Sequence, residues 1–255
     1  MTLHWTTGLI AVAVNAMAQA SGPIPAVETI VSHMVQARAE NRAHLRPYQL
    51  TRNYQLFLGM ETQKSKSEVI AGVTFVPPTS KKYVIQEARG GELGETIVRL
   101  ILASEAEMSK NPISTDISQE NYDFRFIGEE DLDRQSCYVL VLLPRRKDKN
   151  LLRGTVWVDA VSYLVRRVEG EPAKSASMWL HNVHVALGYG DVSGMWLQTS
   201  SESTADVLLL GSHRMISHDT NYQIGKVAVA AGKEAASRPA DSLTSVLRAF
   251  SPFQD

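Results

Sequence analysis

The stretch GTVWVDAVSYLVRRVEGEP, residues 154–172, decides how this chain folds. In its first half Val156 and Val158 share one face, while Trp157 and Asp159 share the other. Alternation with a period of two is typical of strands whose two faces meet different surroundings. The same alternation returns after a tight turn that begins at Asp159, so the stretch is predicted to form a β-hairpin.

The hairpin belongs to a series of similar segments. Eight strands are predicted from Asn121 onward, at residues 122–128, 137–143, 152–159, 163–169, 178–187, 195–201, 206–210 and 215–222. The segments between them carry Gly, Asp, Ser or Pro, and turns are expected at residues 129–133, 145–150, 188–194 and 211–212. Short connections favour antiparallel neighbours, so this half of the chain is predicted to be one long antiparallel meander.

The first half of the chain adds helices to this sheet. Apolar residues recur at helical spacing over residues 26–45 and 93–108, while residues 48–60, 68–76 and 81–88 alternate as strands. Prolines precede and follow the first helix and stop the second. The predicted class is therefore α+β: a large curved antiparallel β-sheet, a half-barrel, with helices covering the concave face.

The two ends of the chain differ from this domain. Residues 9–14 are apolar, and Ala18 and Ala20 fit the A-x-A pattern of a cleaved secretion signal, although no Lys or Arg precedes the apolar run. We expect a signal peptide over residues 1–20 with cleavage after Ala20, a binding domain over 21–224, and an Ala-rich, loosely ordered tail over 225–255. The alternative for the first segment is an apolar N-terminal helix of a cytosolic protein.

Charge and cysteine content exclude several classes of protein. The formal net charge is −1, which argues against a nucleic-acid partner because phosphate binding needs a clustered basic surface. Cys137 is the only cysteine, so no intramolecular disulfide can form. Because Cys137 lies in an apolar strand, a buried and inert thiol is expected.

Motifs that carry chemistry are missing from the sequence. It contains no G-x-S-x-G elbow and no phosphate-binding glycine loop. His181 and His184 are three apart, and His213 and His218 are five apart, spacings that place strand residues on opposite faces. We therefore expect no catalytic residue, no metal and no cofactor. A hydrolase or metalloenzyme remains the alternative if two or more of these histidines converge.

What remains is the shape of the sheet. If helices lie on its concave face, inward side chains of the strands can line an apolar cavity. The ligand-binding residues predicted to line it are Leu50, Tyr54, Leu56, Val73, Phe75, Val139, Val141, Val156, Val158, Leu180 and Leu197. The alternative for each of these residues is ordinary core packing.

Several strings of residues resemble a known family. FIGEEDLDRQSCYVL at 126–140 is similar to the strand–turn–strand of the outer-membrane lipoprotein-sorting (LolA/LolB-like) superfamily, which includes RseB-like periplasmic sensors. Leu143-Pro144 with residues 154–159, residues 168–173 and residues 195–197 resemble other parts of the same sequences. One departure is that residues 133–135, Asp-Arg-Gln, replace the usual Gly-Arg turn. The arginine that works in lipoprotein transfer has no position here that matches by motif.

The resemblance implies a location and a function. It implies a periplasmic carrier without enzymatic activity, whose partners are the acyl chains of lipoproteins or lipids, held in the cavity between sheet and helices. Peripheral contact with membrane proteins is also implied. The alternative is an RseB-like sensor or binding module that recognises an envelope protein.

Overall fold

The computed structural model describes residues 24–60, 64–175, 178–209 and 211–225. The predicted signal peptide and cleavage site lie outside these ranges, as does the predicted tail from residue 226 onward. The elements in chain order are α1 (Val27–Ala43), β1 (Tyr48–Leu58), β2 (Ser67–Val76), β3 (Ser80–Arg89), α2 (Glu92–Met108), a 3₁₀ turn η1 (Pro112–Thr115), β4 (Tyr122–Leu132), β5 (Gln135–Pro144), β6 (Leu152–Asp159), β7 (Val165–Pro172), β8 (Leu180–Val192), β9 (Met195–Val207) and β10 (Gly211–Ile224).

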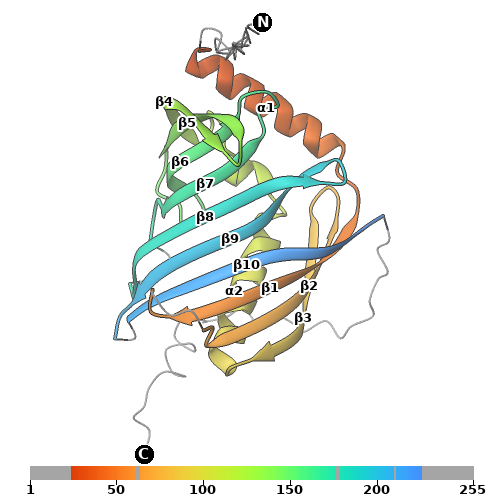
Figure 1. Ribbon diagram of the computed structural model, residues 1–255, viewed down its shortest axis with the longest axis vertical. Coiled ribbons are helices and arrows are strands. Elements are labelled where there is room, and N and C mark those ends of the chain that lie inside the picture. Colours follow the sequence, from red (N-terminus) through yellow and green to blue (C-terminus); the bar gives the residue numbers. More distant parts are fainter. Residues whose placement is uncertain (1–23, 61–63, 176–177, 210, 226–255) are drawn as a thin grey trace, which may run out of the picture.

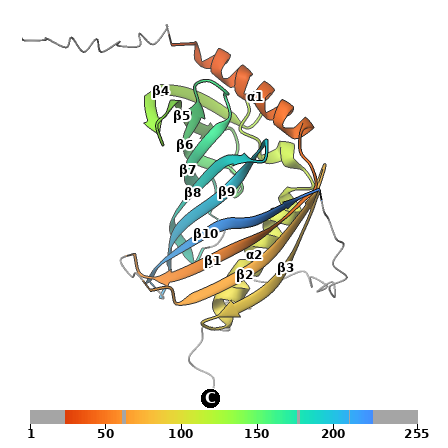
Figure 2. The same cartoon turned by 45° about the vertical axis from the view of Figure 1, so that its right-hand side comes forward.

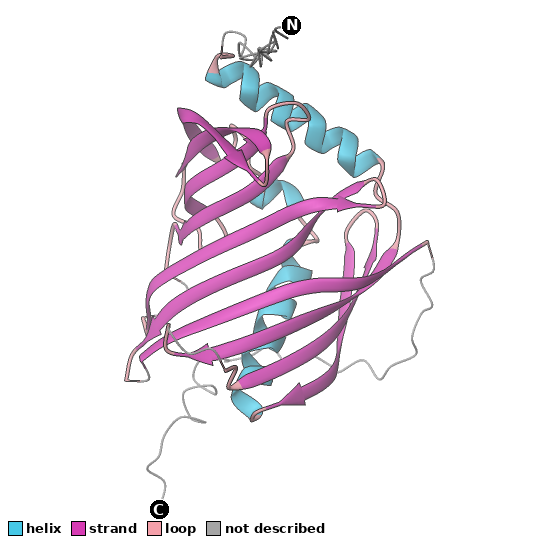
Figure 3. Ribbon diagram, viewed as in Figure 1, coloured by secondary structure: helices cyan, strands magenta, loops and turns pink. Residues whose placement is uncertain are grey.

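All ten described strands form one antiparallel sheet, in the order β3-β2-β1-β10-β9-β8-β7-β6-β5-β4. Strands β1 to β3 and strands β4 to β10 are neighbours in chain order. The pairing of β10 with β1 joins these two groups into one open sheet, with β3 and β4 at its edges (Figure 1). The sheet is strongly curved, and α2 lies inside the curve (Figure 2). Helices form a small part of the molecule (Figure 3). The predicted fold class is therefore confirmed.

Both helices pack on the same face of the sheet. Ile30, Val31 and Met34 of α1 belong to a core with Leu140 and Val156 of the β4–β7 half. The second core lies under α2, where Val98 and Leu102 pack on strands β1 and β2. The strand register connects the two cores across one face through the pairs Val156↔Val168, Val168↔Leu187, Leu187↔Ser201, Ser201↔Ser217 and Ser217↔Tyr54.

The C-terminal end of α1 is tied to the turn between β8 and β9. The Asn41 amide donates to the carbonyl of Trp196 at 2.9 Å and accepts from the Trp196 backbone N–H at 2.8 Å. Arg46 donates to the carbonyl of Ser193. Since each contact satisfies a backbone group, the position of α1 on the sheet is specified by hydrogen bonds as well as by packing.

The hairpin of β6 and β7 forms as predicted, but its turn is longer, because β7 begins at Val165 and not at Tyr163, whose φ is 57°. Asp159 organises this turn. The Asp159 carboxylate accepts hydrogen bonds from the backbone N–H groups of Val161 and Ser162 at 3.1 and 2.8 Å, and from Arg166 at 3.1 Å. Burial alone raises the pKa of this carboxyl, but these hydrogen bonds outweigh it and hold the pKa below its ordinary value. Asp159 therefore stabilises the turn in its charged form.

Several predicted boundaries of strands and turns are wrong, among them the predicted turn at 211–212, which is the start of β10. Residues 206–210 do not form a strand of their own, because β9 continues to Val207 and the chain then turns at Leu208 and Leu209. The predicted turns at 129–133 and 188–194 are mostly strand: β4 and β8 continue to tight turns at Asp133-Arg134 and Ser193-Gly194. All four of these turn residues have positive φ, the conformation that two-residue hairpin turns require. The charged residues and glycines of these two segments predict loops, but in the structure they lie on the solvated faces of β4 and β8.

The part of the chain that the structure describes contains no helix long and apolar enough to cross a bilayer.

Candidate functional site

The structure places most of the predicted lining residues on the face that the helices cover. Leu50, Tyr54 and Leu56 lie on the inward face of β1, and Val73 and Phe75 are their neighbours on β2. From the other half of the sheet the inward residues of the prediction are Val156, Val158 and Leu180. Leu197 pairs with Gly190, the residue after the inward Tyr189, and belongs to neither core, so its predicted place in the lining is wrong. Val156 and Val158 belong to the α1 core, whereas Leu50, Tyr54 and Val73 belong to the α2 core. The prediction of one continuous lining therefore corresponds to two separately packed groups.

Val139 and Val141 lie on the opposite, outer face of the sheet. Val139 is paired with Trp157, while the inward positions of β5 are Leu140 and Leu142. Since β5 is apolar on both faces, its alternation carries no information about which face is inward. The prediction that these two valines line an inward cavity is wrong.

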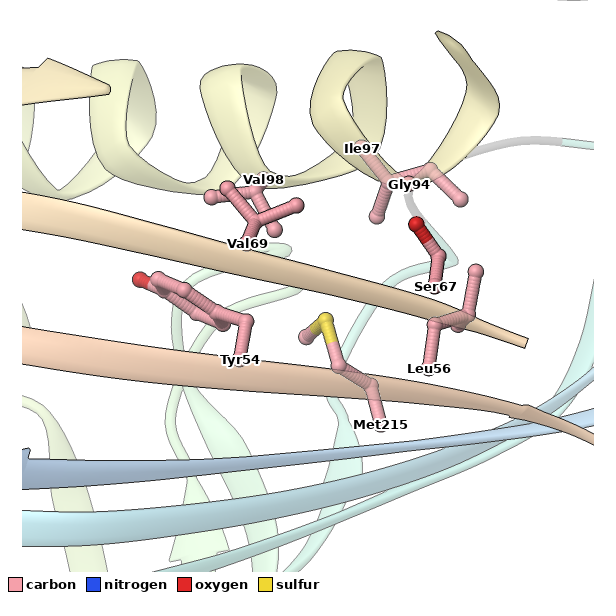
Figure 4. Close-up of a pocket in the computed structure, with 8 residues that line it drawn as sticks. All are labelled: Tyr54, Leu56, Ser67, Val69, Gly94, Ile97, Val98 and Met215. Atoms are coloured by element: carbon pink, nitrogen blue, oxygen red, sulfur yellow. The ribbon is translucent and has the colours of Figure 1, made fainter. Parts of the chain in front are cut away.

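A small apolar pocket lies under the N-terminal half of α2 (Figure 4). Its residues come from α2 and from three neighbouring strands: Tyr54, Leu56, Ser67, Val69, Gly94, Ile97, Val98 and Met215. Its empty space is about 190 Å³, part of it open to solvent, and it encloses no room for a water molecule. Pockets for small molecules usually hold about 300–1,000 Å³. This pocket is therefore nearly filled by the side chains that surround it.

Close approach of α2 to β2 keeps the pocket small. A Cβ atom on Gly94 would lie 2.0 Å from Ser67 Oγ and 2.6 Å from Ser67 Cβ, so only glycine fits here without a shift of the helix. Ser67 is held in place because its hydroxyl donates to the carbonyl of Arg89 at 2.8 Å. The N-terminal half of α2 thus rests directly on the sheet.

A buried ionic cluster ties the C-terminal half of α2 to the sheet. The Arg52 guanidinium on β1 donates to both carboxylate oxygens of Asp219 on β10, at 2.5 and 2.7 Å. It also donates to both oxygens of Glu105 on α2, at 2.9 and 2.8 Å. Lys81 on β3 donates to Glu105 at 2.6 Å. Two cations face two anions, so the cluster is neutral and links three strands to the helix.

The charges in this cluster stabilise one another. Burial alone lowers the pKa of Arg52, but the hydrogen bonds with Asp219 and the charges of Glu105 and Asp219 outweigh it and raise the pKa. Burial alone raises the pKa of Glu105, but Lys81 and Arg52 outweigh it and lower the pKa. Burial raises the pKa of the nearby Tyr48 hydroxyl to about 12, so this tyrosine stays neutral. Arg52 and Glu105 are consequently both charged at neutral pH.

The lowered pKa of Glu105 predicts how acid acts on the fold. A carboxyl with a lowered pKa stabilises the folded state above its unfolded pKa, about 4.5, and loses this contribution as the pH falls through its folded pKa. We expect Glu105→Gln to be less stable than the wild type at pH 7 and to show a flatter decline of unfolding free energy between pH 5 and 3. Urea denaturation at several pH values measures this. Glu107→Gln, whose exposed carboxylate pairs with Lys110, is the control and should follow the wild type; equal slopes for Glu105→Gln and the wild type would contradict the prediction.

Sequence reasoning did not find this cluster. Its one available signal was Arg52, which shares the inward face of β1 with Leu50 and Tyr54. An arginine at an apolar position of a strand requires a buried anion, because an unpaired buried charge is too costly. The two anions, Glu105 and Asp219, are 53 and 167 residues from Arg52 in the sequence, so they can be identified only from the fold.

The argument from histidine spacing needs one correction. His181 pairs with Asp206 and His184 with Thr204, two residues that share a face of β9, so a bulge puts both histidines on the same face. The bulge includes Asn182, whose φ is 50°. Even so, the described residues contain no group of three or more His, Cys, Asp or Glu side chains that could hold a metal ion.

Cys137 and two of the tryptophans have structural surroundings. Cys137 is fully buried, as predicted, and burial raises the pKa of its thiol. On the outer face, the Trp157 indole donates to Glu130 at 2.8 Å. The Trp196 indole donates to the Val165 carbonyl at 2.6 Å and stacks under the Arg166 guanidinium. These contacts account for the polar atoms of both indole rings.

Comparisons with known proteins find a likeness to solved structures. No family model matches the sequence, and no curated protein matches it. A DUF1329 family protein from Desulfovibrio piger is 14% identical with a TM-score of 0.42; the match covers 78% of this chain and 92% of that one. A domain from Vibrio parahaemolyticus, described as an outer membrane lipoprotein-sorting protein domain, is 15% identical with a TM-score of 0.45; the match covers 84% of this chain and 96% of that one.

A LolA superfamily protein from Nitrosomonas europaea is also similar. It is 9% identical with a TM-score of 0.34, and the match covers 77% of this chain and 94% of that one. The Vibrio and Nitrosomonas descriptions belong to the group that the sequence resembles. With identities under 25% and TM-scores under 0.5, the likeness carries no conclusion about what this chain binds.

Proposed function

We propose that this chain is an exported, periplasmic carrier that binds the acyl chains of lipoproteins or lipids between α2 and the concave face of the sheet. The observation that carries the proposal is the apolar pocket under α2, which lies at a helix–sheet contact separate from the α1 core. A carrier of this kind needs no covalent chemistry. Its driving force is burial of hydrocarbon, worth about 0.8 kcal/mol per methylene group.

Loading requires α2 to move away from the sheet. The empty space of about 190 Å³ is too small for an acyl chain, so the described form is the closed one. The helix is held by the close contact of Gly94 with Ser67 at one end and by the ion pairs of Glu105 at the other. An acyl chain that displaces α2 exchanges these contacts for its own burial in the apolar strand face.

A fluorescent fatty-acyl probe tests the carrier proposal. Ile97→Trp places a larger side chain in the pocket, and we expect it to weaken probe binding at least about tenfold, or 1.4 kcal/mol. Val84→Trp adds the same side chain to an exposed position on β3 that faces away from the pocket, and it should bind like the wild type. Lipid analysis of protein purified from its native envelope is the companion measurement. If the wild type binds no probe and carries no lipid, the carrier proposal is wrong.

The alternative is a sensor or binding module for an envelope protein. The observation that favours it is the filled pocket, because recognition of a protein surface needs no internal cavity. Pull-down from envelope extract discriminates between the two: a stoichiometric protein partner without lipid supports the sensor, and lipid without a protein partner supports the carrier.

A further inference from the structure

The hydroxyl of Tyr54 is a buried polar group without a partner. Tyr54 is 3% exposed, and among the described residues its hydroxyl makes no hydrogen bond. Arg52 lies beside it, but a guanidinium has only donors and cannot accept the phenol proton. Burial raises the pKa of this hydroxyl and outweighs the charge of Arg52, which lowers it, so the proton stays on the oxygen. A buried donor without an acceptor is costly, so Tyr54 calls for an acceptor from outside the chain.

Tyr54 stands at one end of the pocket under α2. Its ring is part of the lining, and its hydroxyl oxygen points away from Leu56, Ser67 and Gly94 (Figure 4). Among the described lining residues the one other hydroxyl is that of Ser67, which already donates to the carbonyl of Arg89 at 2.8 Å. The pocket therefore has an apolar end and an end with one free donor.

The inner face of the sheet is polar beside Tyr54. Tyr54 pairs with Ser217, and Ser217 pairs with Ser201, in the register of β1, β10 and β9. The two serine hydroxyls hydrogen-bond to each other at 2.8 Å and lie between the α1 core and the α2 core. The ionic cluster around Arg52 is balanced by its own ion pairs. The Tyr54 hydroxyl is thus the donor that this polar region leaves free for a ligand.

We propose that the Tyr54 hydroxyl donates a hydrogen bond to the carbonyl oxygen of an ester or amide at the head of a bound acyl chain. The hydrocarbon then lies toward Leu56 and Gly94, and the head lies over the serine pair. An acyl chain carries this carbonyl and an alkyl chain does not, so the protein distinguishes the two. This recognition rests on the proposed carrier function and adds to it the group that selects and orients the cargo.

Tyr222 on β10 supplies a matched control. Its hydroxyl is also buried and has no hydrogen-bond partner among the described residues. Its ring lies beside that of Tyr48, with the centroids 6.4 Å apart, and Arg52 separates Tyr48 from Tyr54 along β1. Tyr222 is not part of the pocket lining. Removal of its hydroxyl should therefore leave the binding of cargo unchanged.

Displacement of the fluorescent fatty-acyl probe tests the role of Tyr54. The competitors are the glycerol ester of dodecanoic acid and the glycerol ether of dodecanol, which differ only in the carbonyl group. We expect the wild type to bind the ester at least about fivefold more tightly than the ether, a factor that one neutral hydrogen bond supplies. Tyr54→Phe should bind the two equally, and Tyr222→Phe should keep the wild-type ratio. Without ligand, Tyr54→Phe should be no less stable to urea than the wild type, because it removes a buried donor that has no acceptor.

A third competitor distinguishes the two sources of an acyl carbonyl. N-dodecanoyl glycinamide carries the carbonyl in an amide, as an N-acylated protein does, whereas the glycerol ester stands for a membrane lipid. If Tyr54→Phe weakens binding of the amide more than that of the ester, the recognised cargo is an N-acylated protein. If it weakens binding of the ester more, the cargo is a lipid. Either result supports recognition of the carbonyl by Tyr54.

Three outcomes overturn the role of Tyr54 and leave the carrier function standing. In the first, the wild type binds ester and ether equally. In the second, Tyr54→Phe keeps the wild-type preference for the ester. In the third, Tyr54→Phe is less stable than the wild type and its preference is unchanged, which makes the hydroxyl a structural group. A wild type that binds no probe at all overturns the carrier function and the role of Tyr54 together.

Discussion

Asp219→Ala is expected to destabilise the fold by about 3–5 kcal/mol, because it leaves Arg52 buried without its closest anion. Both oxygens of Asp219 accept hydrogen bonds from Arg52, and the two side chains are only 2% and 4% exposed. Glu105 remains, but it also pairs with Lys81, so one anion would face two cations. A typical domain has about 5–15 kcal/mol of stability, so this loss is a large part of the total.

Urea denaturation measures the loss, and an exposed ion pair supplies its control. Asp123→Ala removes the partner of Arg145, with both side chains more than half exposed, and it should cost less than about 1 kcal/mol. The double variant Arg52→Met/Asp219→Leu removes both buried charges of the pair and should recover part of the stability that Asp219→Ala loses. If Asp219→Ala and Asp123→Ala lower the free energy of unfolding equally, the buried pair contributes no more to stability than the exposed one, and the prediction is wrong.

Gly154→Ala is expected to cost about 3 kcal/mol or more, because the added Cβ atom has no space. It would lie 1.9 Å from the carbonyl oxygen of Glu169 and 2.5 Å from the Cα atom of Gly170 on the neighbouring strand. Gly154 and Gly170 are direct partners in the register of β6 and β7. Backbone atoms cannot rotate away as a side chain does, so the two strands must separate.

Gly190→Ala is the control for this prediction. Gly190 also lies inside a strand, but its Cβ atom would meet only the methyl group of Thr199 at 3.7 Å, an ordinary contact. We expect its unfolding free energy to stay within about 1 kcal/mol of the wild type. Thermal unfolding followed by circular dichroism compares the two variants. If both melt at the wild-type temperature, the close approach of β6 and β7 is not as the structure shows it.

Much of the fold was predictable from local patterns. The helices at 26–45 and 93–108 and the strands at 152–159 and 68–76 agree closely with α1, α2, β6 and β2. Residues 206–210 show where such patterns fail. Their three consecutive leucines suggested a buried strand, yet Leu208 and Leu209 are exposed at a turn, where Leu209 has a φ of 68°. Hydrophobicity reports a preference for burial, but apolar residues also lie on protein surfaces, so a run of leucines does not by itself place a buried strand.

The candidate site was only partly predictable. Tyr54 and Leu56 were predicted to line a cavity, and both line the pocket. The sequence did not predict Ile97 and Met215 as lining residues. Ile97 depends on the direction in which α2 crosses the sheet, and Met215 on the pairing of β1 with β10, and neither can be predicted from the spacing of nearby residues. Whether the predicted residues bind an acyl chain stays a prediction.

The sequence by itself determined the alternation of the hairpin at 154–172, and with it the antiparallel class of the sheet, because period-two patterning depends only on neighbouring residues. The inward direction of Val156 and Val158 also followed from that alternation. Only the tertiary structure decided that the Gly154 and Gly170 backbones touch and that Arg52 meets Glu105 and Asp219. The contacts of Arg52 join segments far apart in the chain, so they exist only once the pairing of β10 with β1 and the packing of α2 bring them together.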